Sequence, residues 1–304
     1  MRILLTGGSG FIGRHLLESL RNQYTIVAPT HAEFDVTDSA QVDQRLRDGR
    51  FDAVVHAAVR GGRHVLDSTL RGYWNLSRNG DRVHRIVYFG SGAEYGKHRD
   101  LVKVAEETIG RETPQDDYGL AKLFCNALSR KSDNVINLRL FGVYGEHEGY
   151  TAKFISNAVT KTLVGLPLTI RQNVVFDYLW IDDLVRVMPR FLEGDRDFAD
   201  VNVTPTDSVS LTEIAALILS EAPRPQEFAI ETPGMNFQYT GDNRRFLEMS
   251  PDFAFTPIAE GVRRLFAHYR GRLETIDRAA LAEDEYRRRC LTRTSSDPAM
   301  ETHK

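Results

Sequence analysis

The chain has 304 residues, of which 41% are hydrophobic and 27% charged, and its formal net charge is −3. This length suits one large or two modest domains, and the composition is that of a globular protein. The small net charge and the lack of a basic stripe exclude nucleic acid as a partner, and no run reaches the ~18 apolar residues of a membrane span. Two widely separated cysteines and a strand that starts beside Met1 predict a cytoplasmic protein without disulfides or a signal peptide.

Short apolar runs alternate with amphipathic helical stretches up to about residue 140. We expect strands at residues 2–6, 24–28, 33–36, 52–58, 85–90 and 134–140, and helices at 11–21, 38–48, 67–79 and 117–130. This alternation predicts an α/β fold of the Rossmann type, a doubly wound parallel sheet. Such sheets bind ligands beyond the carboxyl ends of their strands. One crevice should therefore gather residues 7–10, 30–36, 57–62, 91–96 and 141–150.

The alternation loosens after residue 150. A helix at about 151–164, an apolar stretch at 174–192 and a helix at 211–220 remain. We divide the chain into a dinucleotide-binding Rossmann domain at 1–165, to which some later segments return, and a smaller, partly interleaved substrate domain at 166–270. Residues 271–304 are charged and lack apolar periodicity at their end, so the sequence predicts a flexible tail there.

A glycine-rich stretch, TGGSGFIG at residues 6–13, follows the first strand and begins the first helix. Gly7 would permit a tight turn, Gly10 would let backbone N–H groups approach a pyrophosphate, and Gly13 would let the helix pack close to the sheet. The pyrophosphate would then lie at the positive end of the helix dipole. This loop, which includes Phe11 and Ile12, is therefore predicted to bind a dinucleotide.

The end of the second strand bears on which dinucleotide binds. An acidic residue there holds the ribose 2′-hydroxyl, whereas a basic residue accepts a 2′-phosphate. This strand ends in Pro29, Thr30 and His31, which are neither acidic nor strongly basic. Nothing there repels a phosphate, which slightly favours NADP over NAD. Asp35 comes too late for the ribose and is expected near adenine.

A second motif, YGLAK, places Tyr118 and Lys122 four residues apart on one face of a predicted helix. A tyrosine with a pKa of about 10 is a poor acid or base at neutral pH, and lowering it by ~3 units takes ~4 kcal/mol. A positive charge ~4 Å away supplies about that much at an effective dielectric constant of ~20, but only ~1 kcal/mol in bulk water. We therefore expect Lys122 to lower the pKa of Tyr118 in a desolvated crevice; an ordinary exposed helix pair is the alternative.

Together these segments resemble the extended short-chain dehydrogenase/reductase family, which includes nucleotide-sugar epimerases, dehydratases and ketoreductases. The resemblance covers residues 1–268 and rests, in the family's order, on TGGSGFIG, FDVTD, HAA, GSGAEYG, YGLAK, RLFGVYG and FDYLWIDDL. It implies a catalytic triad of Ser91, Tyr118 and Lys122. It also implies cofactor contacts at Asp35, Val36, Ala57, Ala58, Val59, Phe141 and Val143. Members of the family commonly dimerise, so a homodimer is implied, although no residue of this chain identifies it.

The implied triad suits hydride chemistry. Tyr118 would exchange a proton with a ketone oxygen, Ser91 would donate a hydrogen bond to that oxygen, and Lys122 would hold the nicotinamide ribose. Dehydratases of this family carry Asp and Glu after the catalytic hydroxyl, and its epimerase-reductases carry a cysteine. Here those positions are Gly92 and Ala93, which disfavours elimination and 3,5-epimerisation because both need such a base.

Two activities then remain open, and both act at C4. The leading hypothesis is NAD(P)-dependent reduction of a 4-keto, typically 6-deoxy, nucleotide-diphosphate sugar, because the early segment is compact like that of the family's reductases. The alternative is an NAD-dependent nucleotide-sugar 4-epimerase, for which an acidic ribose clamp would be expected. A non-catalytic dinucleotide sensor is a third hypothesis, against which the intact triad argues.

One departure from the family concerns the substrate diphosphate. Many relatives have an arginine before the aspartate of an R-D-[FY] segment, where this chain has Phe176, Asp177 and Tyr178. Cationic side chains elsewhere in the chain are candidates to replace it, since guanidinium groups suit phosphates. The candidate substrate contacts are Ser91, Gly92, Ala93, Lys153, Lys161, Arg171, Arg244 and Arg245.

Several other features receive structural interpretations. Asp182 and Asp183 are expected to cap a helix, and Cys125 to pack in the core rather than act as a nucleophile. The nine histidines lack the spacing of metal ligands, so no metal is expected. Glu94, the ionisable neighbour of Ser91, should point away from the serine by strand alternation.

Overall fold

A computed structural model describes residues 1–292, and its centre is a six-stranded sheet in which every strand pair is parallel. In spatial order the strands are β11 (Asp200–Val203), β6 (Val135–Leu140), β4 (Arg85–Ser91), β3 (Ala53–His56), β1 (Arg2–Thr6) and β2 (Thr25–Val27). The central strands β3, β4 and β6 are buried along their whole length, as expected for a parallel sheet covered on both faces. The predicted doubly wound α/β fold is confirmed.

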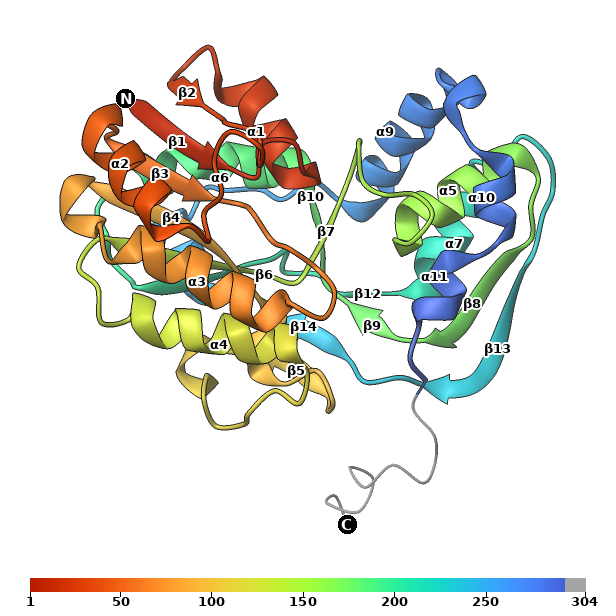
Figure 1. Ribbon diagram of the computed structural model, residues 1–304. Coiled ribbons are helices and arrows are strands. Elements are labelled where there is room, and N and C mark those ends of the chain that lie inside the picture. Colours follow the sequence, from red (N-terminus) through yellow and green to blue (C-terminus); the bar gives the residue numbers. More distant parts are fainter. Residues whose placement is uncertain (293–304) are drawn as a thin grey trace.

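Helices cover both faces of the sheet (Figure 1). On one face α1 (Phe11–Leu20) packs against α6 (Ile181–Glu193), and the other face carries α2 (Ser39–Gly49), α3 (Val65–Ser77) and α4 (Asp117–Ser129). The apolar side chains that α1 buries, Leu16 and Leu20, are four residues apart and so lie on one side of the helix. Helix α6 comes from late in the chain, so the first lobe is built from non-contiguous segments.

Residues 33–36, expected as a strand, form a turn instead. The side chain of Glu33 accepts hydrogen bonds from the backbone and hydroxyl of Thr30, and that of Asp35 accepts from both the backbone and the hydroxyl of Thr37. Short polar side chains that bond to nearby backbone groups in this way favour turns over strands. Asp38 then caps α2 by accepting from the backbone N–H groups of residues 40 and 41.

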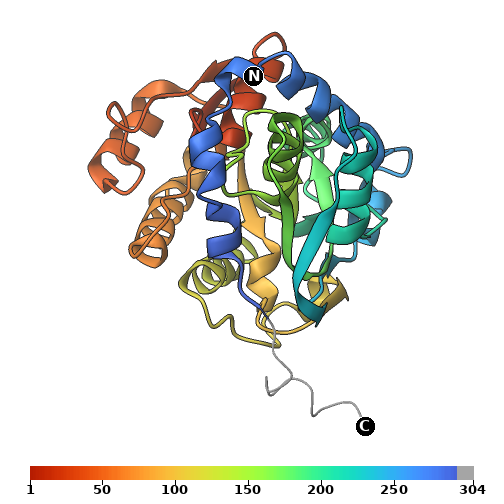
Figure 2. The same ribbon diagram turned by 90° about the vertical axis from the view of Figure 1, so that its right-hand side faces the viewer.

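A second, smaller lobe carries α5 (Phe154–Val164), α7 (Leu211–Ser220) and α9 (Ile258–Arg270), together with the parallel pair β8 (Leu168–Asn173) and β13 (Phe228–Met235). In Figure 2, α5 (green) lies between α7 (teal) and the C-terminal helices (blue). The boundary expected at residue 165 therefore falls too late, because α5 packs on α7 and α9 rather than on the parallel sheet.

The remaining elements are short. Between the lobes lie a four-stranded sheet of β12 (Val209–Ser210), β9 (Val175–Phe176), β14 (Tyr239–Gly241) and β5 (Leu101–Val104), and the pair β7 (Gly142–Tyr144) and β10 (Tyr178–Trp180). The others are the single turns η1 (Gly80–Arg82), η2 (Gly92–Tyr95), η3 (Glu106–Thr108) and η4 (Leu273–Thr275), and helix α8 (Arg244–Met249). Among residues 1–292, no helix combines the length and the apolar character needed to cross a membrane.

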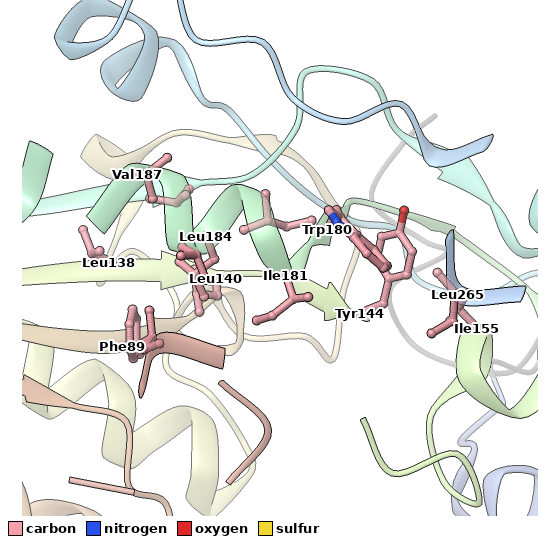
Figure 3. Close-up of a cluster of buried hydrophobic side chains, with 14 of the residues drawn as sticks. Phe89, Leu138, Leu140, Tyr144, Ile155, Trp180, Ile181, Leu184, Val187 and Leu265 are labelled. Carbon is pink, nitrogen blue, oxygen red and sulfur yellow. The ribbon is translucent and has the colours of Figure 1, made fainter. Parts of the chain in front are cut away.

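The two lobes share one hydrophobic core (Figure 3). It extends from the sheet through α6 into the second lobe, and its members include Phe89, Leu138, Leu140, Ile181, Leu184, Val187, Tyr144, Trp180, Ile155 and Leu265. Trp180 is 2% exposed and packs edge-on against the ring of Tyr144. Because this core is continuous, side chains between the lobes are held by packed elements of both.

The start of α6 differs from the prediction. Its N-cap is Trp180, so Asp182 and Asp183 lie in the first turn rather than at the cap. Asp183 is buried and accepts hydrogen bonds from the backbone and hydroxyl of Thr256. Its carboxylate thus ties the start of α6 to the segment before α9, and the positive end of the helix dipole favours its charge.

The flexible tail predicted from residue 271 is wrong for residues 271–292. Two short helices, α10 (Arg278–Ala282) and α11 (Glu285–Arg289), pack on α5 and β8. The ring of Tyr286 contacts Phe154, and Asp284 forms a 2.7 Å ion pair with Lys161. These anchors are too sparse to give the segment apolar periodicity. The rest of the predicted tail, residues 293–304, lies outside the described residues.

Candidate active site

A cavity of about 390 Å³ is formed at the carboxyl ends of β1 and β3 and the loop after β2. Eight of the predicted cofactor residues line it: Gly7, Gly10, His31, Asp35, Val36, Ala57, Ala58 and Val59. Thr6, Ser9, Phe34 and Arg60 line it too and lie within the segments predicted to form the glycine loop or the crevice. The residues of the lining that the sequence did not indicate are Thr37, His56, Ser68 and Thr69. Ser68 and Thr69 had no signal of their own because they lie on α3, whereas Ser9 lies within the glycine loop.

The glycine loop cannot carry side chains at two of its positions. Gly7 has a φ of +77°, and a Cβ there would lie 2.6 Å from the backbone nitrogen of Ala58. A Cβ on Gly13 would lie 2.0 Å from the carbonyl oxygen of Gly7. The loop, the first turn of α1 and the loop after β3 are therefore in backbone contact. This leaves the N-terminus of α1, with its unpaired N–H groups, directed at the cavity, as in sites that bind phosphate.

The cavity also contains a buried polar atom without a partner. Thr69 is one of the residues that line the cavity, it is 5% exposed, and its hydroxyl oxygen has no hydrogen-bond partner among the described residues. Buried hydroxyls are nearly always satisfied, so an unsatisfied one at a cavity wall indicates a polar ligand. With the glycine loop, this fits a dinucleotide.

The end of the cavity at β2 carries charge of both signs. Partial burial works against ionisation of Asp35, but two hydrogen bonds from Thr37 and the nearby side chains of His31 and Arg60 outweigh it and lower the pKa of the carboxyl. Of the other predicted residues, Thr30 bonds to Glu33, and Phe11 and Ile12 pack against the core; none of the three lines the cavity.

Ser91 lies where β4 ends, at the N-cap of turn η2. Its hydroxyl accepts a hydrogen bond from the backbone N–H of Ala93 at 3.2 Å, and the Glu94 carboxylate accepts from the backbone N–H of Ser91 at 2.9 Å. The prediction that Glu94 points away from Ser91 is wrong in this respect, since a turn of 3₁₀ helix replaces strand alternation here. The reciprocal bonds fix the backbone that presents the serine.

Beneath this turn, the fully buried guanidinium of Arg139 on β6 donates to Glu94 at 2.8 Å and to Asp200 at 2.9 Å. These carboxylates raise the pKa of Arg139 although burial works against its charge. The Glu94 carboxylate is thereby committed to an ion pair and to the backbone of Ser91. It is not free to act as a base.

Tyr118 and Lys122 lie on α4, whose first turns pack against η2. Burial raises the pKa of Tyr118, and a hydrogen bond with Ser91 works in the opposite direction. Burial lowers the pKa of Lys122 to about 8. The site is desolvated as expected, and Ser91 and Tyr118 are brought together.

The expectation that Lys122 lowers the pKa of Tyr118 is not met in this structure. The Lys122 ammonium donates to the carbonyl oxygen of Phe89 at 2.6 Å and lies 4.4 Å from the centre of the Tyr88 ring. Its distance to the centre of the Tyr118 ring is 5.7 Å. Ser91, rather than Lys122, is the neighbour that works against the rise in the pKa of Tyr118 caused by burial.

The cationic candidates for the substrate lie in different places. Lys161 is buried against Asp284, and Arg245 bonds to Asp200 and Glu107, so both have carboxylate partners. Arg244 pairs with Asp242. Arg171 donates to the carbonyl of Arg287, and Lys153 is exposed at the N-cap of α5.

The segment that lacks the family's arginine has a structural role. Asp177 is fully buried between β9 and β10 and accepts hydrogen bonds from the backbone N–H of Gly241, from Ser208 and from Lys103. Phe176, at the position of the missing arginine, packs its ring on Tyr239. Among residues 1–292, no group of three or more side chains has the arrangement of a metal site.

Comparison with known proteins agrees with this geometry. Residues 3–204 match the model of the NAD dependent epimerase/dehydratase family. The chain is 25% identical over 317 aligned residues to a dTDP-4-dehydro-6-deoxy-D-allose reductase from Streptomyces sp, covering 88% of this chain and 96% of that protein. It is 26% identical over 261 residues to an ADP-L-glycero-D-manno-heptose-6-epimerase from Cupriavidus pinatubonensis, covering 72% and 78%.

Solved structures share the fold. A GDP-mannoheptose C4 reductase from Campylobacter jejuni with NADP bound superposes with a TM-score of 0.77 at 16% identity, covering 89% of this chain and 98% of that one. A UDP-glucose 4-epimerase from Thermotoga maritima with UDP-glucose gives 0.77 at 19% identity, covering 90% and 100%. Since the family match spans about two thirds of the chain and includes the glycine loop and the Ser91–Tyr118 site, the protein is an enzyme of the NAD dependent epimerase/dehydratase family, of the extended short-chain dehydrogenase/reductase type.

Proposed function

We propose that the protein reduces the C4 ketone of a nucleotide-diphosphate sugar, typically a 6-deoxy sugar, with NADPH. The observation that carries this proposal is the composition of the catalytic end. Ser91 and Tyr118 are brought together there with Lys122 on the same helix, while positions 92 and 93 have no ionisable group and Glu94 is committed to Arg139. Such a site supports proton exchange at one oxygen but offers no second base for elimination or epimerisation at C3 or C5.

Each residue of the triad has a distinct role in this reaction. When bound, the reduced nicotinamide supplies the hydride that adds to C4. Tyr118 gives its phenolic proton to the ketone oxygen, and because burial raises its pKa it holds that proton at neutral pH. Ser91 donates a hydrogen bond to the same oxygen and stabilises its developing charge. Lys122, whose ammonium lies 5.7 Å from the centre of the Tyr118 ring, would hold the nicotinamide ribose.

The dinucleotide would be held by the cavity described above. The glycine loop and the N-terminus of α1 would contact the pyrophosphate, and Thr69 would donate to a polar group of the ligand. We propose a preference for NADP, supported by His31 and Arg60 at the β2 end of the cavity; Asp35 at the same end is expected near adenine and not at the ribose. Titration of protein fluorescence should give a lower Kd for NADPH than for NADH, and His31→Asp should reverse the order.

The proposed activity is tested by following NADPH absorbance at 340 nm with 4-keto-6-deoxy sugars carrying GDP, dTDP, UDP or CDP. Turnover with at least one of these sugars, lost in Tyr118→Phe, is expected. No turnover with any of the four would contradict the proposal. Protein that contains tightly bound NAD⁺ and interconverts C4 epimers without added cofactor would establish the 4-epimerase instead.

We also propose that the enzyme acts in the cytoplasm as a homodimer. Trp74 on α3 and Phe124 on α4 are 52% and 48% exposed, and the two helices pack against each other. Large apolar side chains exposed on adjacent helices are typical of an interface. Light scattering should give about twice the 34.4 kDa mass of one chain, and Trp74→Glu should reduce it to that of a monomer. A monomeric wild-type protein would contradict this proposal.

A further inference from the structure

A second tyrosine lies beside the catalytic serine. Tyr239, on β14, comes from 148 residues later in the chain than Ser91, and its hydroxyl oxygen lies 3.4 Å from Ser91 Oγ. The ring is held between two others: that of Phe141 meets it edge-on at 5.1 Å, and that of Phe176 at 4.7 Å. Tyr239 is 8% exposed. Its hydroxyl is therefore fixed in place by the small four-stranded sheet between the lobes.

The hydrogen bonds at Ser91 Oγ determine what the serine can do. A serine hydroxyl has two acceptor lone pairs and one O–H to donate. The backbone N–H of Ala93 occupies one lone pair at 3.2 Å. A hydroxyl of Tyr239 that donates occupies the second. The serine O–H is then left to donate, and Tyr118, whose pKa responds to Ser91, lies close to it.

Tyr239 can act as the donor of its pair, and the length of the pair bears on when the bond tightens. Burial raises the pKa of Tyr239, so the hydroxyl keeps its proton throughout the physiological range. The distance of 3.4 Å is long for two hydroxyls, and hydrogen bonds of catalytic groups commonly shorten only when the reacting complex forms. The pair is thus arranged to tighten as charge develops on the far side of the serine.

The backbone next to the serine is shaped around this hydroxyl. A Cβ on Gly92 would lie 2.7 Å from the Tyr239 hydroxyl and 2.6 Å from the Phe141 ring. Any side chain at position 92 would therefore displace the second tyrosine or the ring that supports it. Gly92, which has no side chain that could act as a second base, thus also leaves space for the hydroxyl of Tyr239.

We propose that Tyr239 is a positioning residue that orients the Ser91 hydroxyl, so that the serine O–H points to the place that the substrate carbonyl oxygen would occupy beside Tyr118. This proposal rests on the proposed function of Ser91 and Tyr118. Without the Tyr239 hydroxyl, the serine O–H is free to rotate away, and it stabilises neither the developing alkoxide nor the Tyr118 phenolate as well.

The test compares Tyr239→Phe, which keeps the ring and its packing, with Tyr73→Phe. Tyr73 is a matched control because its hydroxyl also bonds to a serine, Ser129 Oγ, at 2.8 Å in the core between α3 and α4. Tyr239→Phe should lower kcat about tenfold, the effect of one hydrogen bond, with KM within twofold. On a Ser91→Ala background the same change should have no further effect, because the influence of Tyr239 passes through the serine. Tyr73→Phe should leave kcat unchanged.

A second measurement does not depend on turnover. The absorbance of tyrosinate near 295 nm is recorded against pH, and the difference between the wild type and Tyr118→Phe gives the titration of Tyr118. The midpoint of this titration should move to higher pH in Tyr239→Phe. It should stay unchanged in Tyr73→Phe. Unchanged kcat and an unchanged Tyr118 titration in Tyr239→Phe would overturn the proposal, as would a full tenfold loss on the Ser91→Ala background.

The titration also separates this proposal from the proposed function. If the wild-type enzyme reduces no nucleotide sugar, the proposed function fails, while the titration still decides the role of Tyr239. If Tyr239→Phe melts well below the wild type, Gly92→Ala replaces it, since its methyl group displaces the same hydroxyl. The Tyr118 titration should then move in the same direction, and a fixed titration would overturn the proposal.

Discussion

Substitution of Gly13 by alanine tests the dinucleotide cradle most sharply. Its Cβ would lie 2.0 Å from the Gly7 carbonyl oxygen, 2.7 Å from the Gly7 carbonyl carbon and 2.9 Å from Gly8 Cα. An ordinary contact begins at 3.4 Å, so loop and helix must separate by about 1.4 Å. Helix α1 resists this shift because Leu16 and Leu20 are buried against the core. The loop therefore moves, and its backbone leaves the position from which it contacts a pyrophosphate.

The size of the effect follows from these contacts. Overpacking of this kind costs about 1–3 kcal/mol, and a protein of this size loses about 2–4 °C of Tm for each kcal/mol. Loss of one hydrogen bond to a charged phosphate costs a further ~1.5–3 kcal/mol of binding, which raises Kd at least about tenfold. Calorimetric titration with NADPH measures Kd, and a thermal melt measures Tm.

The matched control is Gly271→Ala. Gly271 follows α9, and a Cβ there would meet nothing closer than 3.7 Å, so this variant should bind and melt like the wild type. Wild-type affinity for NADPH in Gly13→Ala would refute the reasoning, because it would mean that the contact between loop and helix does not shape the binding site.

Three further substitutions test other parts of the account. Lys122→Met should lower turnover at least about 100-fold, yet unfold in urea at pH 7 no earlier than the wild type, because burial already lowers the pKa of this ammonium to about 8. Burial raises the pKa of Glu148 from 4.5 to about 7, so the folded state holds a proton that the unfolded chain has released. The free energy of unfolding of the wild type should then fall by about 3 kcal/mol as the pH rises from 4.5 to 7. In Glu148→Gln, the free energy of unfolding measured in urea should not show this part of the pH dependence. Arg139→Met leaves the buried Glu94 carboxylate without its cation, while Asp200 keeps Arg130 and Arg245, and should cost about 3–5 kcal/mol in the same assay. The first of these predictions would be contradicted if Lys122→Met unfolded at a lower urea concentration than the wild type. The second would be contradicted if Glu148→Gln kept the full pH dependence of the free energy of unfolding, and the third if Arg139→Met were as stable as the wild type.

Features encoded by neighbouring residues were predictable. The helix expected at 211–220 has those limits in the structure, because Ser210 and Glu213 form a capping box within four residues of sequence. The glycine loop and five strands of the parallel sheet were likewise found from local patterns, whereas β11 was not expected. The strand expected at 33–36 does not form, because the carboxylates of Glu33 and Asp35 accept hydrogen bonds from nearby backbone N–H groups and so favour a turn. A pattern of alternating apolar residues does not indicate such hydrogen bonds.

Features that depend on distant segments were not predictable from these patterns. Tyr239 reaches Ser91 across 148 residues, and Arg139 reaches Asp200 across 61. In the sequence, Tyr239, Arg139 and Asp200 have the pattern of ordinary members of short strands. The direction of the Glu94 side chain was predicted wrongly because the 3₁₀ turn η2 begins directly after Ser91. In this turn the carboxylate points back toward Ser91, whereas in a strand it would point away. Packing between lobes, and not local periodicity, therefore completes the candidate site.

The central claim is hydride transfer to C4 by a site whose acid is Tyr118. Its most direct test is incubation of the enzyme with NADPH deuterated at the transferable position of the nicotinamide and a 4-keto-6-deoxy nucleotide sugar, followed by mass spectrometry and NMR of the product. The account predicts a sugar with one deuterium, located at C4, and no labelled product from Tyr118→Phe. A product without deuterium, or label at C4 that persists in Tyr118→Phe, would contradict it.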